Sequence, residues 1–260
     1  MILTVTDMKR LLIAVVAALV SFPLSAADTL AVKAVAQDCS IYKFEPRQLI
    51  APAALIGIGA IGSAIDDFKE LDFGLRKPHD GGFVFEDVTQ YVPVAGFYAL
   101  KLSGVQSAHN YRDATVILAA SYCITAVATK LVKVVADVER PNGLDNNSFP
   151  SGHSAVAFMG AEFLRMEYKD TSPWIGVAGY AVATGTALAR IGHNEHWFTD
   201  LLAGAGVGIL GTRAAYWIYP QVQKILFGKS MDRKREQGCS FMSLPYYNGE
   251  SAGISLALQF

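Results

Sequence analysis

Residues 149–154 read Phe149-Pro150-Ser151-Gly152-His153-Ser154, at the point where a polar loop passes into an apolar run. Serine and glycine are favoured at the cap of a helix, and proline is pre-organised for its first turn. The stretch therefore predicts a helix that begins here and carries His153 in its first turn. The backbone N–H groups at a helix start have no partner within the helix, so they can hold an anion.

Charged residues flank this helix start on both sides. Upstream, Lys133 and Arg140 are seven residues apart, which places them on one stripe of a helix that Pro141 ends. Downstream, His196 and Asp200 stand at i and i+4, so that the carboxylate can orient the imidazole. Each pattern alone is typical of a solvated helix face or a polar pair at a helix end.

Taken together, these patterns predict a phosphoryl-transfer site. Arg190 adds a third cation, and three cations beside a helix start favour an anion. A carboxylate-oriented histidine is a nucleophile, and a second histidine can act as a general acid. The three cysteines form no Cys-x-x-Cys motif and no cluster with histidine, so the sequence predicts neither a metal nor a cofactor.

The composition of the chain points to a membrane. Its 260 residues suit one domain, but 52% of them are apolar and only 17% are charged. That is too apolar for an ordinary soluble domain. The formal net charge of -1 gives no reason to expect nucleic acid as a partner, and no signal indicates an oligomeric state.

The two ends of the chain differ from its middle. At the start, Lys9 and Arg10 precede an apolar run and the small residues Ser25-Ala26-Ala27, which predicts a signal peptide cleaved after Ala27 or an uncleaved anchor. At the end, alternating segments around Asn248-Gly249 predict a β-hairpin, with strands at Phe241–Pro245 and Gly253–Phe260. The expected organisation is a signal or anchor (1–27), a helical domain (28–238) and a hairpin appendage (239–260).

The apolar runs also predict a topology. If all six strong runs span a membrane with the N-terminus inside, the basic loops lie in the cytoplasm and the loops 139–150 and 192–197 lie outside. Small-residue patterns at 176–179 and 204–208 allow close helix packing. The six runs are Leu11–Leu24, Leu49–Ile65, Ala114–Val135, Ser154–Leu164, Trp174–Ile191 and Leu201–Tyr219.

Some residues bear on this topology individually. The run at Ser154–Leu164 is short and leads into charged residues, which favours a soluble protein instead. Cys123 is expected to be a small core residue. In the six-span topology Cys39 lies outside and Cys239 inside, so that the two cannot pair. His79 and His109 lie in polar segments and are expected to be exposed.

The motif-bearing segment, residues 133–200, resembles a known family. Its order and spacing are similar to the three-part signature of the type 2 phosphatidic acid phosphatase superfamily, which also holds bacterial acid phosphatases and vanadium haloperoxidases. The matching segments are Lys133-x6-Arg140-Pro141, Pro150-Ser151-Gly152-His153 and Ala189-Arg190-x5-His196-x3-Asp200. The sequence departs from the family at Ala189, where serine is usual, and so lacks a hydroxyl near the phosphate.

The resemblance implies an all-α helical bundle, embedded in a membrane, and assigns roles to residues. His196 attacks phosphorus to give a phosphohistidine, Asp200 orients it, and His153 protonates the leaving alcohol and then activates water. The residues that hold the phosphate oxygens are Lys133, Arg140, Ser151, Gly152 and Arg190.

The expected function is therefore metal-independent hydrolysis of a lipid-linked phosphate, at the periplasmic face of a bacterial inner membrane. Phosphatidate, phosphatidylglycerol phosphate, undecaprenyl diphosphate and lipid A phosphates all fit as substrates. One alternative is a soluble periplasmic acid phosphatase of broad specificity. Further alternatives are a vanadium-dependent haloperoxidase, in which His196 binds vanadate, and a non-enzymatic membrane protein that keeps the scaffold.

Overall fold

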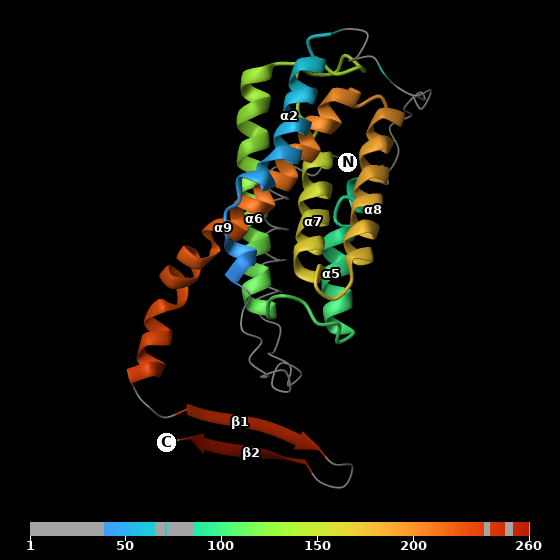
Figure 1. Cartoon of the computed structure of the whole chain (residues 1–260). Helices are drawn as coiled ribbons and strands as arrows, with labels where there is room; N and C mark the ends of the chain where they lie inside the picture. The colour runs from blue at the N-terminus through green and yellow to red at the C-terminus, as the bar shows by residue number, and fades with distance from the viewer. Residues whose placement is uncertain (1–38, 66–70, 72–85, 237–239, 248–251, 260) are drawn as a thin grey trace. The chain divides into compact units, whose positions relative to one another are not determined.

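The computed structural model describes residues 39–65, 71, 86–236, 240–247 and 252–259 (Figure 1). The predicted signal or anchor, the first apolar run, His79 and Cys239 lie outside the described residues. The chain divides into two compact units, of which the larger covers Asp38–Asp232. The end of the last helix and the C-terminal strands belong to the smaller unit.

Every regular element that the structure describes in the larger unit is a helix, which confirms the expected all-α class. Its elements are two 3₁₀ turns, η2 (Cys39–Tyr42) and η3 (Pro46–Leu49), and the helices α2 (Ile50–Gly62), α4 (Glu86–Thr89), α5 (Val92–Leu102), α6 (Tyr111–Ala136), α7 (Gly152–Tyr168), α8 (Pro173–Gly192) and α9 (Phe198–Glu236).

Helix α7 is the central element of this unit. Most of its residues are buried, and it packs against α5, α6 and α8. Glycines on α9 bring that helix against α7 as well. A Cβ atom at Gly204 would lie 2.4 Å from the carbonyl oxygen of Ser151, and one at Gly208 would lie 2.2 Å from that of Ala155. The small-residue pattern at 204–208 therefore marks a close helix contact, because no larger side chain fits there.

The burial of α7 changes the meaning of its charged residues. Glu162 and Glu167 are buried inside the protein, where Glu162 pairs with Arg165 and Glu167 pairs with His109. The shortness and charge of this run, which favoured a soluble protein, are therefore properties of a central helix surrounded by other helices. The expectation that His109 is exposed is wrong, because Glu167 and Tyr42 bind its imidazole in the interior.

Helix α6 is polar on its inner side and apolar on its outer side. Its buried stripe includes Ser121, Thr125 and Thr129, whereas Leu131 is 63% and Val135 is 85% exposed. This distribution is the reverse of that in a water-soluble helix, and it suits a helix that faces lipid. α6 and the segment Phe198–Leu226 are the two described helices that are long and apolar enough to cross a membrane.

The outward face of α6 also carries Cys123. The thiol is exposed, so the expectation of a core cysteine is wrong. The physical reason is that an apolar run is buried in the protein only on the side that meets other helices, and Cys123 lies on the other side.

The smaller unit includes two strands, β1 (Ser240–Tyr247) and β2 (Ala252–Gln259). They pair antiparallel, with Ser240 opposite Gln259 and Tyr247 opposite Ala252. β1 is longer than the strand predicted from the alternation of residues, Phe241–Pro245.

Candidate active site

The helical unit gathers the predicted site residues at one end. In Figure 1, α6 and α8 finish at the end where α7 and α9 begin. Lys133 lies in the last turn of α6, Arg190 in the last turn of α8, and Asp200 in the first turn of α9. Four chain segments therefore meet where helix starts leave N–H groups and helix ends bring cations.

The start of α7 is anchored directly to the start of α9. Ser151 is the N-cap of α7, and its hydroxyl accepts a hydrogen bond from the N–H of Ser154 at 3.4 Å. The N–H of Ser151 itself donates to the carbonyl oxygen of Asp200 at 3.0 Å. The predicted helix start is therefore present, although Pro150 precedes the cap rather than lying in the first turn. These contacts fix the spacing between the Ser151–His153 segment and the predicted nucleophile.

His196 and Asp200 lie side by side in the interior. The side chain of His196 is 2% exposed, and its Nδ1 atom lies 3.5 Å from Oδ2 of Asp200. That same oxygen accepts hydrogen bonds from the Ser148 hydroxyl and from the N–H of Trp197. Because α9 begins at Phe198, His196 precedes the helix and is not on its face as the i, i+4 spacing predicts. The two side chains are neighbours all the same.

The charge state of His196 follows from its environment. Burial lowers its pKa to about 4, because the imidazolium loses its hydration, and the nearby Asp200 carboxylate offsets part of this effect. The imidazole is therefore neutral near pH 7, with a lone pair available on one nitrogen. A neutral, carboxylate-oriented imidazole is the form that can attack phosphorus.

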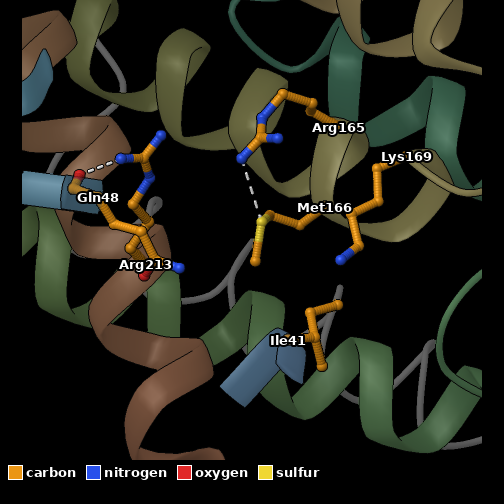
Figure 2. Close-up of a pocket in the computed structure, with 6 residues that line it drawn as sticks. All are labelled: Ile41, Gln48, Arg165, Met166, Lys169 and Arg213. Atoms are coloured by element: carbon orange, nitrogen blue, oxygen red, sulfur yellow. Dashed lines mark hydrogen bonds between the residues drawn. The ribbon is translucent and has the colours of Figure 1, made fainter. Parts of the chain in front are cut away.

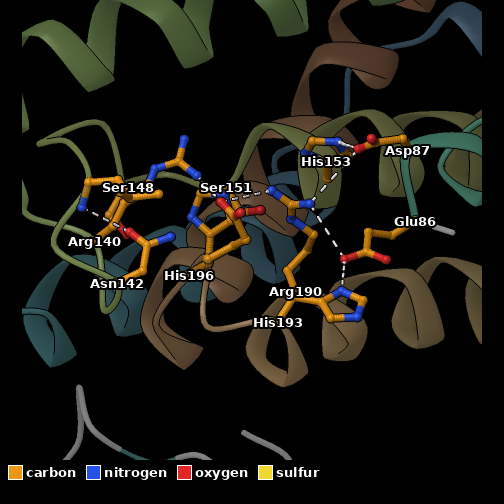
Figure 3. Close-up of polar contacts among 12 residues, drawn as sticks. Glu86, Asp87, Arg140, Asn142, Ser148, Ser151, His153, Arg190, His193 and His196 are labelled. Atoms are coloured by element: carbon orange, nitrogen blue, oxygen red, sulfur yellow. Dashed lines mark hydrogen bonds and ion pairs between the residues drawn. The ribbon is translucent and has the colours of Figure 1, made fainter. Parts of the chain in front are cut away.

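His153 has a carboxylate partner of its own. Its Nε2 atom lies 2.8 Å from Oδ1 of Asp87, which belongs to α4 (Figure 3). Burial and then the positive charge of Arg190 lower the pKa of His153 below its ordinary value, whereas the hydrogen bond to Asp87 opposes this change. Both predicted catalytic histidines thus have an acidic partner.

The three predicted cations approach this region from different elements. The ammonium group of Lys133 donates to the carbonyl oxygens of Asn147 and Ser148. Arg140 lies in the loop after α6, because that helix ends at Ala136 with Asp137 in a left-handed conformation, φ 46°. The expectation that Lys133 and Arg140 share one helical stripe up to Pro141 is therefore wrong. The left-handed cap turns the chain before Arg140 is reached.

Both arginines form ion pairs with carboxylates. Arg140 binds Asp145 through Nε at 2.8 Å and Glu195 through a terminal nitrogen. Arg190 lies 3.5 Å from Glu86, 3.9 Å from Asp87 and 3.3 Å from Glu195. Figure 3 shows Arg190 between the His153–Asp87 pair and the segment that contains His196.

Sequence reasoning missed three of these acidic residues: Glu86, Asp87 and Glu195. Glu86 and Asp87 lie in α4, far upstream of the motif segment, so no spacing relates them to it. Glu195 fills a spacer position of the third motif, where the pattern demands no residue type. His193, which also lies outside the motif, caps α8 and contacts Glu86. These three acidic residues are identified only by their contacts in the folded protein, since each of them lies within 4 Å of Arg190.

A second polar region lies toward the other end of α7 (Figure 2). A cavity of about 220 Å³ is lined there by Ile41, Gln48, Arg165, Met166, Lys169 and Arg213. These residues include no histidine, and Glu162 forms ion pairs with both arginines. None of the site residues predicted from the sequence lines this cavity.

Comparisons with known proteins agree with the predicted resemblance. Residues 113–224 match the family model described as "PAP2 superfamily". A segment of 79 residues is 52% identical to the "Lipid A 1-phosphatase" of Porphyromonas gingivalis and covers 30% of this chain and 18% of that protein. The chain thus spans less than one fifth of the length of this curated relative.

Two solved structures are also similar to the chain. "LpxE" of Aquifex aeolicus shares 22% identity, with a TM-score of 0.40 over 51% of this chain and 83% of that one. A "PAP2 type phosphatidylglycerolphosphate phosphatase" from Bacillus subtilis shares 16% identity, with a TM-score of 0.38 over 80% of this chain and 91% of that one.

Proposed function

Because residues 113–224 match the PAP2 superfamily model, we propose that the chain is a phosphatase of this superfamily that acts on a lipid-linked phosphate without a metal ion. One observation carries this proposal. The buried His196 lies next to Asp200, at the end of the bundle where Lys133, Arg140 and Arg190 approach the start of a helix that carries a second histidine. This arrangement supplies a nucleophile, an acid and positive charge in one place.

The geometry supports a two-step reaction. The lone pair of His196 attacks phosphorus, the bond to the leaving oxygen breaks, and His153 gives that oxygen its proton. A water molecule then attacks the phosphohistidine, His153 takes up the proton from that water, and His196 is released with inorganic phosphate. The equatorial oxygens, over which charge spreads, are held by Lys133, Arg140, Arg190, the Ser151 hydroxyl and the N–H of Gly152.

The outer surface supports a lipid substrate. The apolar outer face of α6 ends near Lys133, so that a substrate tail can lie in the bilayer while its phosphate enters the site. The identity to a lipid A 1-phosphatase, which extends over 79 residues, favours a lipid A phosphate among the candidate substrates. We place the site at the periplasmic face of a bacterial inner membrane, in the six-span topology that the basic residues predict.

Phosphate release from a matched panel of substrates tests the proposal. The purified chain is expected to hydrolyse detergent-dispersed lipid A, phosphatidate, phosphatidylglycerol phosphate and undecaprenyl diphosphate at unequal rates, with EDTA present throughout. Equal rates on soluble phosphomonoesters without detergent would support a broad-specificity acid phosphatase instead. Activity that requires added magnesium would contradict the metal-free mechanism.

The topology has its own test. A membrane-impermeant thiol reagent applied to sealed cells is expected to leave Cys239 unlabelled, because the six-span topology places it inside. Labelling of Cys239 without prior lysis, or a bridge between Cys39 and Cys239, would overturn this topology without affecting the catalytic proposal.

A further inference from the structure

Glu195 bridges the two arginines that are expected to bind phosphate. Its Oε2 atom is bonded to a terminal nitrogen of Arg140 and lies 3.3 Å from a terminal nitrogen of Arg190. The two arginines come from different segments, the loop after α6 and the last turn of α8. A single carboxylate oxygen thus sits where two guanidinium groups converge, next in sequence to the nucleophile His196.

We propose that the Glu195 carboxylate occupies the position of the substrate phosphate between the two arginines, so that a substrate phosphate must displace it to bind. This inference rests on the proposed function, because it assigns Arg140 and Arg190 to the phosphate. Phosphate oxygens and carboxylate oxygens seek the same donors on guanidinium groups. Glu195 therefore sets how tightly the site holds any phosphate group.

The other acidic residues around the arginines do not fit this role. Glu86 is 1% exposed and is bonded to His193 as well as Arg190, so that it is held in the interior. Asp145 binds the Nε side of Arg140 and contacts neither Arg190 nor the nucleophile in any interaction that the structure describes. Glu195 alone in this group bridges both arginines.

Glu195 also has a way out of the subsite. Its side chain is 16% exposed, so that rotation about its side-chain bonds can take the carboxylate to solvent. Its backbone stays in place, because its N–H donates to the carbonyl oxygen of Arg190 at 3.1 Å. The preceding Asn194 adopts a left-handed conformation, φ 59°, which defines the turn. Displacement thus requires movement of one side chain and leaves His196 where it is.

Displacement of a carboxylate has a consequence for substrate choice. It weakens the binding of every phosphate by the same factor, because the competing group is part of the protein. A soluble phosphomonoester or free inorganic phosphate has few other contacts with which to compensate. A lipid substrate gains additional binding energy from its apolar tail. Glu195 therefore lowers inhibition by the product phosphate, and a lipid phosphate, whose tail adds binding energy, is the kind of substrate that can still bind tightly.

Two substitutions separate this role from a positioning role. Glu195→Gln keeps an oxygen that can accept from the arginines but removes the charge, whereas Glu195→Ala removes the group altogether. If Glu195 competes with phosphate, both variants bind inorganic phosphate and orthovanadate more tightly, by about tenfold. If Glu195 instead holds the arginines in place, Glu195→Ala binds these anions more weakly.

Isothermal titration calorimetry on the full-length chain in detergent measures these affinities. Glu139→Gln is the matched control, because it removes the same charge from an exposed side chain beside Arg140 and is expected to bind phosphate like the wild type. Steady-state kinetics give a second readout: KM for p-nitrophenyl phosphate and the inhibition constant of inorganic phosphate should both fall in Glu195→Gln, while the ratio of kcat/KM between a lipid phosphate and p-nitrophenyl phosphate stays the same.

The possible results distinguish failure of the Glu195 inference from failure of the proposed function. Unchanged or weaker anion binding in both Glu195 variants, or absence of binding in all proteins, overturns the inference. If the wild type hydrolyses no phosphate ester while Glu195→Gln still binds phosphate more tightly, the proposed function fails and the inference about the subsite stands. If hydrolysis is observed and binding does not change, the function stands and the role of Glu195 is wrong.

Discussion

The buried polar groups at the two ends of α7 differ in how completely they are hydrogen-bonded. Toward its C-terminal end, Glu162 is bonded to Arg165, Arg213 and Tyr180, and a second cluster joins Glu167 to His109 and Tyr216. At its N-terminal end, buried polar atoms without a hydrogen-bond partner gather, namely Glu86 Oε2, Ser154 Oγ, Arg190 Nε, Asn194 Oδ1, His196 Nδ1, Thr199 Oγ1 and Asp200 Oδ1. No side-chain atom of the C-terminal clusters named here is among the unpaired atoms, although the hydroxyl of Tyr219, whose ring packs against His109, is unpaired, as are those of Thr125 and Thr129.

This difference separates structural from functional polar groups. A buried charge is costly unless its partners satisfy it, so a cluster that only supports the fold is closed. A binding site, by contrast, must keep donors and acceptors that it can offer to its ligand. By this criterion the N-terminal end of α7 suits the proposed reaction site, and the C-terminal clusters suit a role in stabilising the helix bundle.

The sharpest way to break this distinction is His196→Ala. We expect turnover to fall by about 10⁴-fold or more, because no other described histidine lies beside Asp200. The far-ultraviolet circular dichroism spectrum should not change. Acid-quenched phosphoenzyme, labelled from a ³²P substrate, should form in the wild type and be absent from the variant. Equal labelling of both proteins would remove His196 from the mechanism.

Glu162→Gln should produce the opposite effect at the other end of α7. The variant leaves Arg165 and Arg213 without their shared carboxylate, and loss of one partner from a buried ion pair costs about 3 kcal/mol of folding free energy. Because Arg165 is 36% exposed, solvent reduces the cost on its side.

The readouts for this variant are the thermal unfolding midpoint in detergent and kcat per folded molecule. The midpoint should fall while kcat is retained, and the exposed Glu45→Gln should change neither. A loss of kcat without loss of stability would contradict the proposal, because it would indicate that the reaction takes place toward the C-terminal end of α7.

The sequence predicted much of this site, and for a definite reason. Motif spacing reports residues that lie close together in the chain, and Ser151–His153, Arg190, His196 and Asp200 sit at helix ends within short segments. Their convergence then follows from four consecutive elements that meet at one end of the bundle.

What the sequence did not reveal depends on packing between distant segments. Asp87 reaches His153 across 66 positions and His109 reaches Glu167 across 58, and neither pair has a local pattern. Cys123 was misplaced for a related reason, since an apolar helix next to lipid exposes residues that would be core residues in water. Composition identifies such a helix, but only the neighbouring helices decide which of its sides is inside.

The pH dependence of kcat/KM distinguishes the roles of the two histidines in the proposed site. His196 attacks only when neutral, so activity should be lost as the pH falls through its pKa of about 4. His153 must be protonated to act as an acid, and its pKa is lowered, so activity should also be lost as the pH rises through a value below 6.5. The free enzyme is therefore expected to have an acidic optimum.

Asp87→Asn tests the second limb of this profile. The hydrogen bond and charge of Asp87 raise the pKa of His153, so that their removal should move the basic limb to lower pH and leave the acidic limb in place. Asp145→Asn removes a carboxylate that binds Arg140 instead, and it should leave both limbs where they are. A basic limb that does not move in Asp87→Asn would contradict the assignment of His153 as the acid.

The smallest expected effect concerns the one departure from the family signature. Ala189, in the last turn of α8, stands where the family usually has serine. Because a hydrogen bond to a charged group contributes about 1.5 kcal/mol, Ala189→Ser should raise kcat/KM by about tenfold or less. The matched control is Ala181→Ser, which adds the same hydroxyl to an exposed position of the same helix and should not change the rate. A gain in Ala189→Ser alone would show that the site has room for the missing donor, whereas equal rates in all three proteins would contradict the prediction.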